Sequence, residues 1–487
     1  MPFQFILPAT PIAPGEAINT ATDFARFFAA GSRPASDWAV GAELELIGFT
    51  ADTLERLGPQ QIQAVIRGFD DQISRRVVEH GYVTEALLDD AAARRRGDAG
   101  KEEAYDQGTT VAAPPRRRAA ASPLGRLTLE PGGQVEFSGA AQASLVEIER
   151  GLRQFTGRLA EIAAVEKLIF VTLGFDPLRQ SGEQRWIPKA RYQIMRPYLK
   201  ARGARAWDMM CRTAAIQVNL DYSDLEDLAR KFQLATRLAP VAAAMFANSP
   251  FENGKLSGYK STRYRAWLDT DPDRTGPSPV GLGDDFSIER FVDYVAGVPM
   301  FFVRREGDYI DLAGHSFSEY LAGCGCPMTP IFQDFTDHLT TIFTEARLKP
   351  HIEQRSMDCG STEMVMGAMA FWKGLMYDQA ALQEAMRLAP RLTRGEYAAL
   401  QLDVARRGLD ASIKNLPLIA IAGEAIEIAR AGLQRIAAAE TPYLDLLEER
   451  VTRERLTNAD ILIRNFEGTW HGDIRKAIAD CGLRIAD

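Results

Sequence analysis

The chain has 487 residues, of which 46% are hydrophobic and 25% are charged, a composition typical of a folded globular protein and not of a disordered one. Its formal net charge is -8, which disfavours nucleic acid as the main partner because binding to phosphates requires a basic surface. No apolar run is long enough to span a membrane, the N-terminus lacks the basic and apolar regions of a signal peptide, and the five cysteines are few and odd in number. We therefore expect a cytoplasmic protein without a membrane partner, either a monomer or a homodimer.

The first polar pattern along the chain lies in a strand predicted from Trp38 to Phe49, after a helix predicted over residues 19–31. Apolar residues of this strand share one parity, and Glu43 and Glu45 share the other. Alternation with a period of two is typical of a strand with one buried face. Taken alone, a strand whose acidic face meets solvent is the simpler interpretation.

The next two segments are predicted to be a helical region and an insertion. Residues 52–90 are predicted to be helical. Residues 91–123 are polar and contain Gly, Pro and two Arg triplets, a composition that predicts a mobile insertion. A basic clamp for an anion is the alternative, and a solvated insertion is the simpler interpretation.

The segment from Arg126 to Ser138, RLTLEPGGQVEFS, predicts two strands joined by a turn at residues 131–133. Apolar residues alternate on both sides of the turn, while Glu130, Gln134 and Glu136 have the opposite parity. Carboxylates gathered on a rigid surface repel one another unless a cation lies between them. The pattern therefore predicts a divalent-metal site, with Mg²⁺ as the ion because all the ligands would be oxygens.

Two later strands, over residues 212–221 and 351–357, also present polar residues on one face. The second is the weaker prediction, because only Ile352 is apolar on its other face. The polar faces of these four strand regions, with residues 126–138 taken as one, carry these residues: Glu43, Glu45, Glu130, Glu136, Gln217, Asn219, Glu353 and Arg355. Four such strands suggest a curved antiparallel sheet with a polar, cation-lined pocket. Glutamates that bridge Mg²⁺ ions suit a nucleoside triphosphate, because the ions neutralise its phosphates.

Basic residues gather in two segments between these strands. Residues 186–199 contain Lys189, Arg191 and Arg196 near aromatic residues, which fits either a surface helix or recognition of phosphate or carboxylate groups. Residues 261–276 combine arginines, aspartates and a tryptophan, which fits either a salt-bridged surface loop or a loop that grips a charged ligand.

The rest of the chain is predicted to be mainly helical. A helix is expected over residues 224–246, with Pro240 bending or ending its regular part. Helical spacing recurs over residues 364–487, and no linker separates this part from the sheet. We therefore expect an α+β fold, with the curved antiparallel sheet flanked by helices and a helical C-terminal part packed on the core.

Several blocks resemble, in the same order, the plant and proteobacterial type of glutamate–cysteine ligase: VGAELELIGF, LTLEPGGQVEFSG, PKARYQIMRPYL, DMMCRTAAIQVNLDY, FANSPFENGKLSGY, WLDTDPDRTG, VPMFFV and HLTTIFTEARLKPHIEQRSMD. The resemblance spans Val40 to Asp358, and no Walker A segment, dinucleotide fingerprint, zinc motif or nucleophile elbow competes with it. It implies a glutamine-synthetase-like sheet funnel and a single catalytic domain over residues 1–487.

The resemblance also implies an activity in glutathione biosynthesis. The side-chain carboxylate of glutamate takes the terminal phosphate of ATP, and the amine of cysteine attacks the acyl phosphate to give γ-glutamylcysteine. ATP is then a co-substrate, and two or three Mg²⁺ ions are the cofactors.

Individual roles follow from matching the family's motifs to this sequence. The metal ligands implied are Glu43, Glu45, Glu130, Glu136, Gln217 and Glu353. The catalytic residues implied are Arg355, which would stabilise the phosphoryl group, and Glu43. The substrate-binding candidates are Arg263 and Arg265, for the glutamate α-carboxylate, with Arg212, Met210 and Trp267 as further pocket residues. The nucleotide-binding candidates are Asn219, Arg355 and Arg347. Glu345 and Arg347 form a second, lower-ranked pair with the spacing of Glu353 and Arg355.

The chain departs from the family's pattern in three places. Leu46 and Ile47 stand where the family usually has a basic residue, the stretch Ser356–Met364 has one glycine and no aromatic residue, and residues 50–123 do not match. A divergent ligase that joins glutamate or a similar acid to a different amine is therefore a rival hypothesis. Guanidino-type phosphotransfer and a catalytically silent amino-acid or nucleotide sensor are two more hypotheses that the sequence leaves open.

Overall fold

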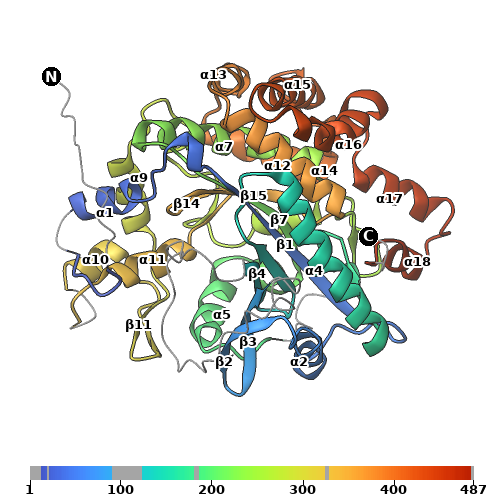
Figure 1. The fold of residues 1–487 in the computed structure, drawn as a ribbon, viewed down its shortest axis with the longest axis horizontal. Helices are drawn as coiled ribbons and strands as arrows, with labels where there is room; N and C mark the ends of the chain where they lie inside the picture. The colour runs from blue at the N-terminus through green and yellow to red at the C-terminus, as the bar shows by residue number, and fades with distance from the viewer. Residues whose placement is uncertain (1–12, 19–20, 90–122, 180–185, 324–327, 484–487) are drawn as a thin grey trace.

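The computed structural model describes residues 13–18, 21–89, 123–179, 186–323 and 328–483 (Figure 1). Within these ranges one large sheet is built from β1 (Val40–Thr50), β2 (Ile73–Glu79), β3 (Tyr82–Asp89), β4 (Pro123–Leu129), β5 (Val135–Gly139), β6 (Leu168–Val171), β7 (Ala215–Leu220), β14 (Ala346–Leu348) and β15 (Ile352–Asp358). The strand order is β14-β15-β7-β1-β5-β4-β3-β2, with β6 paired to β1, and every pair is antiparallel.

The helices surround this sheet. Their bounds are α1 (Ala21–Ala29), α2 (Pro59–Arg67), α4 (Leu145–Glu166), α5 (Arg191–Arg202), α6 (Ala206–Arg212), α7 (Leu225–Met245), α8 (Thr262–Trp267), α9 (Ile288–Gly297), α10 (Phe317–Leu321), α11 (Phe332–Thr340), α12 (Thr362–Met376), α13 (Gln379–Leu388), α14 (Arg394–Arg407), α15 (Leu418–Ile436), α16 (Asp445–Glu448), α17 (Asn458–Glu467) and α18 (Ile474–Asp480).

Short strands form four small pairs outside the large sheet. They are β8 (Phe251–Glu252) with β9 (Lys255–Leu256), β10 (Thr275–Gly276) with β13 (Phe343–Thr344), β11 (Phe302–Arg305) with β12 (Asp308–Asp311), and β16 (Ser412–Ile413) with β17 (Leu416–Pro417).

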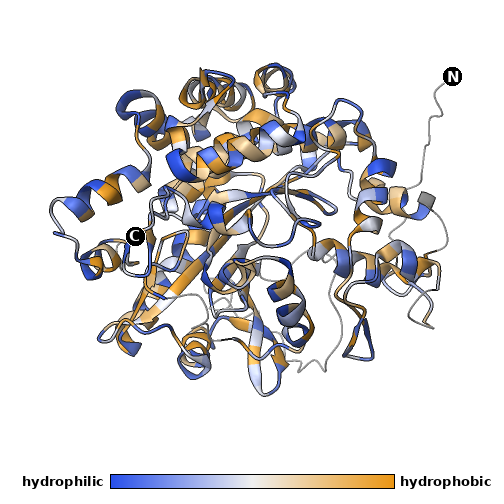
Figure 2. Cartoon of the chain, turned by 180° about the vertical axis from the view of Figure 1, so that it is seen from behind, coloured by the Kyte–Doolittle hydropathy of each residue, from blue (hydrophilic) through white to orange (hydrophobic). Residues whose placement is uncertain are grey.

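Helices α4, α7 and α12 pack against the central strands of the large sheet, and α13 and α15 pack on α12 from outside (Figure 1). All the residues of α12 except Glu363 are buried, as expected of a helix that lies between a sheet and a further layer of helices. The outer helices carry hydrophilic and hydrophobic bands side by side, the pattern of helices with one buried face (Figure 2). No helix in the described ranges is both long and apolar enough to cross a membrane.

Most of the predicted elements are confirmed. The antiparallel sheet, its flanking helices and the helical C-terminal part are present, and α7 continues through Pro240 to Met245 instead of ending there. The helical prediction for residues 52–90 is wrong: only α2 is helical, and β2 and β3 form a hairpin whose turn places His80 and Gly81 at positive φ. The predicted insertion at 91–123 lies outside the described residues, apart from Pro123 at the start of β4.

The close contact between α12 and α15 generates a stability prediction. A Cβ atom added at Gly374 would overlap the carbonyl oxygen of Ala429, and both groups belong to helix backbones that cannot easily move apart. We expect Gly374→Ala to lower the free energy of unfolding by about 1–3 kcal/mol. Gly157→Ala on α4 is the matched control, because nothing lies within 4 Å of the added atom, and it should stabilise by about 0.5–1 kcal/mol. Urea unfolding measures both free energies. Equal changes in the free energy of unfolding for Gly374→Ala and Gly157→Ala would contradict the tight packing of α12 against α15.

Candidate active site

Strand register brings acids from separate parts of the sequence onto one face of the sheet. Glu43 of β1 lies opposite Gln217 of β7 on one side and Ser138 of β5 on the other. Glu45 lies opposite Glu136. Side chains directly opposite each other in antiparallel strands share a face, so these residues form two adjacent rows. Because polar residues alternate with apolar ones along each strand, pairing of the strands brings these polar side chains onto one face.

This polar face lines a cavity of about 460 Å³, a volume within the usual range for small-molecule sites. Six predicted metal ligands line it: Glu43, Glu45, Glu130, Glu136, Gln217 and Glu353. Basic residues line it as well: Arg126, Lys189, Arg191, Arg263, Arg347, Lys349 and Arg355. Its apolar wall includes Met195, Met209, Met210 and Phe302. The cavity therefore combines an acidic floor, basic groups and an apolar wall.

Four of the acids have no basic partner. The amides of Asn219 and Gln217 donate to Glu43 and Glu45, each at 2.8 Å. The hydroxyl of Ser138 donates to Glu136 at 2.9 Å. Within the described ranges, no lysine or arginine forms an ion pair with these carboxylates or with Glu130. The four acids are half-buried, so their negative charges repel one another in a poorly solvated place.

The pKa values of two of these acids are raised, first by burial and then by the neighbouring carboxylates. Burial raises the pKa of Glu45 to about 8, and the charge of Glu130 adds to the effect. Burial also raises the pKa of Glu136 well above its ordinary value, with Glu43 and Glu130 contributing next. A cation bound among these oxygens would reverse both effects, and carboxylate and amide oxygens suit a hard divalent ion. Among the described residues, no three acidic, histidine or cysteine side chains already stand grouped to ligate one ion, so the carboxylates would have to turn toward it.

Glu353 is surrounded by basic groups, unlike the other acids. Arg347 donates to both of its oxygens, at 2.6 and 3.0 Å. Lys349 and Arg355 approach it at 2.7 and 2.8 Å. Although burial opposes ionisation, these three cations hold the pKa of Glu353 well below its usual range. In this arrangement Glu353 orders basic groups that face the cavity.

Arg355 is well placed to contact a ligand. Its Nη1 atom donates to Gln217 and Glu353, at 3.1 and 2.8 Å. Its Nε and Nη2 atoms donate no hydrogen bond to another described residue, and its guanidinium lies 5.7 Å from the ring centroid of Trp267. Arg347, in contrast, is engaged by Glu353 and by the carbonyl oxygen of Thr340.

Some predicted site residues reach the cavity and others do not. Arg263, Met210 and Trp267 line it. Arg265 does not, and it lies against the ring of Tyr259. Asn219 supports Glu43 by a hydrogen bond but is not part of the cavity wall.

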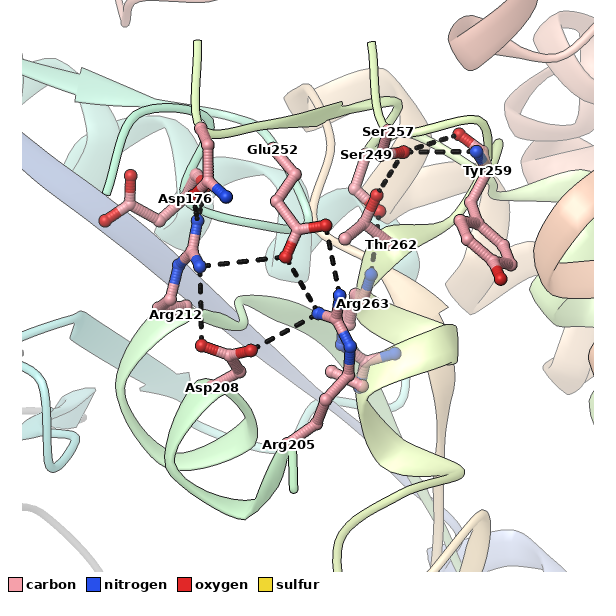
Figure 3. A network of polar contacts seen from close by, with 12 residues as sticks. Asp176, Arg205, Asp208, Arg212, Ser249, Glu252, Ser257, Tyr259, Thr262 and Arg263 are labelled. Carbon is pink, nitrogen blue, oxygen red and sulfur yellow. Dashed lines mark hydrogen bonds and ion pairs between the residues drawn. The ribbon is translucent and has the colours of Figure 1, made fainter. Parts of the chain in front are cut away.

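Arg212, which the sequence predicts as a pocket residue, also lies outside the lining of this cavity. It is 1% exposed and donates to Asp208, to the carbonyl oxygen of Asp176 and to Asn253. Figure 3 shows it within a polar network that includes Arg205 and Glu252. A buried guanidinium needs such compensation, so Arg212 is occupied in holding α6, whose Met210 reaches the cavity.

The lower-ranked pair and two loop residues also have defined places. Glu345 lies behind the cavity wall, where Tyr264 and Tyr397 donate to its carboxylate. Lys189 reaches the cavity and donates to the carbonyl oxygen of Leu129 at 2.8 Å, and burial lowers its pKa to about 8. Lys349 was not predicted, since a lysine in a tight turn carries no sequence pattern that distinguishes it from a surface residue.

Comparisons with known proteins identify the family of the chain. The family model Glutamate-cysteine ligase family 2 (GCS2) matches residues 39–480, which includes the segment after Thr50 where the sequence blocks showed no resemblance. The chloroplastic glutamate–cysteine ligase of Brassica juncea is 33% identical over 476 residues, which cover 96% of this chain and 86% of the relative. The enzyme of Medicago truncatula is 32% identical over 478 residues, covering 97% and 87%.

Two solved structures share the fold at low sequence identity. Glutamate–cysteine ligase from Francisella tularensis in complex with AMP has a TM-score of 0.52 at 11% identity, covering 92% of this chain and 88% of that one. A bifunctional glutathione synthetase from Pasteurella multocida has a TM-score of 0.50 at 12% identity, covering 91% and 51%.

The sheet, its acidic cavity and these similarities define a carboxylate–amine ligase. More narrowly, the chain belongs to glutamate–cysteine ligase family 2, because the family model covers most of its length and curated relatives exceed 30% identity.

The unpartnered acids predict how stability depends on pH. Because the pKa of Glu45 is raised from 4.5 to about 8, the folded protein binds more protons than the unfolded chain between these values. Without metal ions, we expect the free energy of unfolding to fall as pH rises from about 5 to 8, by up to about 1.4 kcal/mol per pH unit for this proton. Urea unfolding in the presence of a chelator measures it. Glu45→Gln removes the titrating group and should flatten the dependence; an unchanged slope would contradict the raised pKa.

Proposed function

We propose that the protein forms γ-glutamylcysteine from glutamate and cysteine, in an ATP- and Mg²⁺-dependent reaction that passes through γ-glutamyl phosphate. Membership of the family supports this reaction. The observation that carries it is the row of half-buried carboxylates that form no ion pair with a described basic residue, in a cavity of ligand size.

Two or three Mg²⁺ ions would be held by Glu43, Glu45, Glu130 and Glu136, with Gln217 as an amide ligand. The donor set fits, because all its members offer oxygens and the acids lack another cation among the described residues. When bound, the ions would neutralise the charge of the triphosphate and of the transferred phosphoryl group. Glu353 remains a candidate ligand, and it would have to exchange a basic partner for an ion.

The side chains of this chain supply binding and charge stabilisation. In the first step an oxygen of the glutamate γ-carboxylate bonds to the terminal phosphorus of ATP, and the bond from that phosphorus to ADP breaks. The unpartnered N–H groups of Arg355 suit the oxygens of the transferring group, with Arg347 and Asn219 ordering its surroundings.

The second step transfers the acyl group to the amine. The nitrogen of cysteine bonds to the γ-carbonyl carbon, the bond from that carbon to the phosphate oxygen breaks, and the amine releases its proton to solvent. Arg263 would hold the α-carboxylate of glutamate, because its Nε atom is buried without a hydrogen-bond partner beside Trp267. Met210 and its neighbours in the apolar wall would exclude water from the acyl phosphate.

A ligase that uses a different amine is the second candidate function. Leu46 and Ile47 are buried in β1, where the family usually carries a basic residue, so contacts beside the acidic face differ from the family pattern. Four further points stay predictions. They are the cytoplasmic location, the absence of nucleic-acid and membrane partners, the monomeric or homodimeric state and the single catalytic domain.

An assay of ADP release with glutamate, Mg²⁺ and a panel of amines tests the proposed function, with mass analysis of the product. We expect ADP release to require glutamate and cysteine together and the product mass to be that of γ-glutamylcysteine. Release with a different amine would support the second candidate. A stable phosphorylated product without an amine would indicate phosphotransfer, and ATP binding without cleavage would indicate a sensor.

The same assay tests the acidic face. We expect Glu45→Gln to lower kcat by about 100- to 1,000-fold while the protein stays folded, because the site loses a charge that the ions and phosphates require. Glu161→Gln on α4 is the control, since that residue is exposed and pairs with Arg158 at the surface. Normal turnover of the Glu45 variant would contradict the metal assignment.

A further inference from the structure

Asp358 is a buried carboxylate close to the active site, but its side chain does not face the cavity. It is the last residue of β15, pairs with Ala215 of β7 and is 1% exposed. It does not line the cavity. Its Oδ2 atom accepts from the backbone N–H of Asn248 at 2.9 Å and from the hydroxyl of Ser249 at 2.6 Å. Its Oδ1 atom accepts from the hydroxyl of Ser261 at 2.8 Å.

The hydroxyl oxygens of Ser249 and Ser261 also accept hydrogen bonds from the first turn of α8. The hydroxyl oxygen of Ser261 accepts from the backbone N–H of Tyr264 at 3.0 Å, which makes Ser261 the N-cap of the helix. The hydroxyl oxygen of Ser249 accepts from the backbone N–H of Arg263 at 3.2 Å. A hydroxyl has one proton to donate. Because both protons go to Asp358, the lone pairs of both oxygens are turned toward α8.

Helix α8 carries Arg263, which lines the cavity. The side chain of Arg263 contacts β15, the strand that carries Asp358. The guanidinium of Arg263 donates to the carbonyl oxygens of Arg355, at 2.7 Å, and of Ser356, at 3.2 Å. Its Nη1 atom lies 3.9 Å from Oδ1 of Asp358. The main chain and the side chain of Arg263 are therefore both fixed to residues 355–358 of β15.

We infer that Asp358 is a positioning residue, which fixes α8 so that Arg263 and Arg355 lie at the separation that an acid substrate needs. The inference rests on the proposed function, in which Arg263 holds the α-carboxylate of glutamate and Arg355 stabilises the phosphoryl group on its γ-carboxylate. These two groups belong to one small molecule, so the separation of the two arginines decides whether it binds with its reactive oxygen in place. Asp358 itself touches neither substrate.

The site leaves little room for adjustment around Asp358. A Cβ atom added at Gly174 would lie 2.6 Å from its Cγ atom, so the carboxylate is packed against the backbone of the neighbouring loop. Asp358→Asn keeps the size of the side chain, but its amide nitrogen cannot accept a hydrogen bond. At least one of the three donors then loses its acceptor, and the serine hydroxyls are free to turn away from α8.

Steady-state kinetics and hydrogen exchange on the full-length protein test this role. We expect Asp358→Asn to raise the KM for glutamate by about 10- to 100-fold. The KM for ATP should change by less than about threefold, because only the acid site is displaced. Amide hydrogens of residues 261–267 should exchange faster than in the unaltered protein. A merely structural role would not separate the two KM values.

Asp334→Asn is the matched control. Asp334 is also buried, it accepts from Arg305 at 2.6 and 2.8 Å and from the hydroxyl of Tyr320 at 3.0 Å, and it does not line the cavity. The Asp334→Asn variant should be less stable than the unaltered protein, and its KM for glutamate should be unchanged. If both variants lose stability and neither changes this KM, the inference is overturned.

The test also covers a variant that does not fold and an unaltered protein that shows no activity. If Asp358→Asn fails to fold, Ser249→Ala and Ser261→Ala replace it: a raised KM for glutamate in either supports the inference, and unchanged values in both overturn it. If the unaltered protein releases no ADP with glutamate and cysteine together, the proposed function fails, and the hydrogen-exchange comparison of Asp358→Asn with Asp334→Asn alone decides whether Asp358 orders α8.

Discussion

The structure depends on one constraint: the register of β1 against β5 and β7 forces like charges together in a poorly solvated cavity. Glu45 faces Glu136 across one pair and Glu43 faces Gln217 across the other, so the carboxylates cannot move far apart without breaking the sheet. Such an arrangement is unfavourable for a protein alone, and the raised pKa values record its cost. The helices behind the sheet keep the strands in place, so the cavity remains ready for cations and a polyphosphate.

The parts of the site that lie on regular strands could be predicted from sequence. In β1, β5 and β7 the polar residues alternate with apolar ones, and a period of two assigns a face without any knowledge of which strands pair. The turn at residues 131–133 is likewise evident from its Pro-Gly-Gly sequence. The resemblance to a family then supplies the pairing, because it brings together segments that sequence periodicity cannot connect.

The parts that could not be predicted depend on tertiary contacts. The hairpin β2–β3 is an exception, because its local sequence already favours strands: it carries Val77, Val78 and Val83, and His80-Gly81 adopts the positive φ values of a tight hairpin turn. Arg212 follows Met210 closely in the sequence, yet the end of α6 turns it into a buried ion network. The basic groups around Glu353 include Lys349, whose role appears only when the hairpin β14–β15 is formed.

The most direct test of the central claim is to locate the divalent ions. Mn²⁺ can replace Mg²⁺ in crystals grown with a non-hydrolysable ATP analogue, and its anomalous scattering marks each ion. We expect peaks within about 2.5 Å of carboxylate oxygens from Glu43, Glu45, Glu130 and Glu136, with the phosphates of the analogue on their other side. Ions held by the nucleotide alone, or bound elsewhere on the protein while these four acids stay unliganded, would contradict the account.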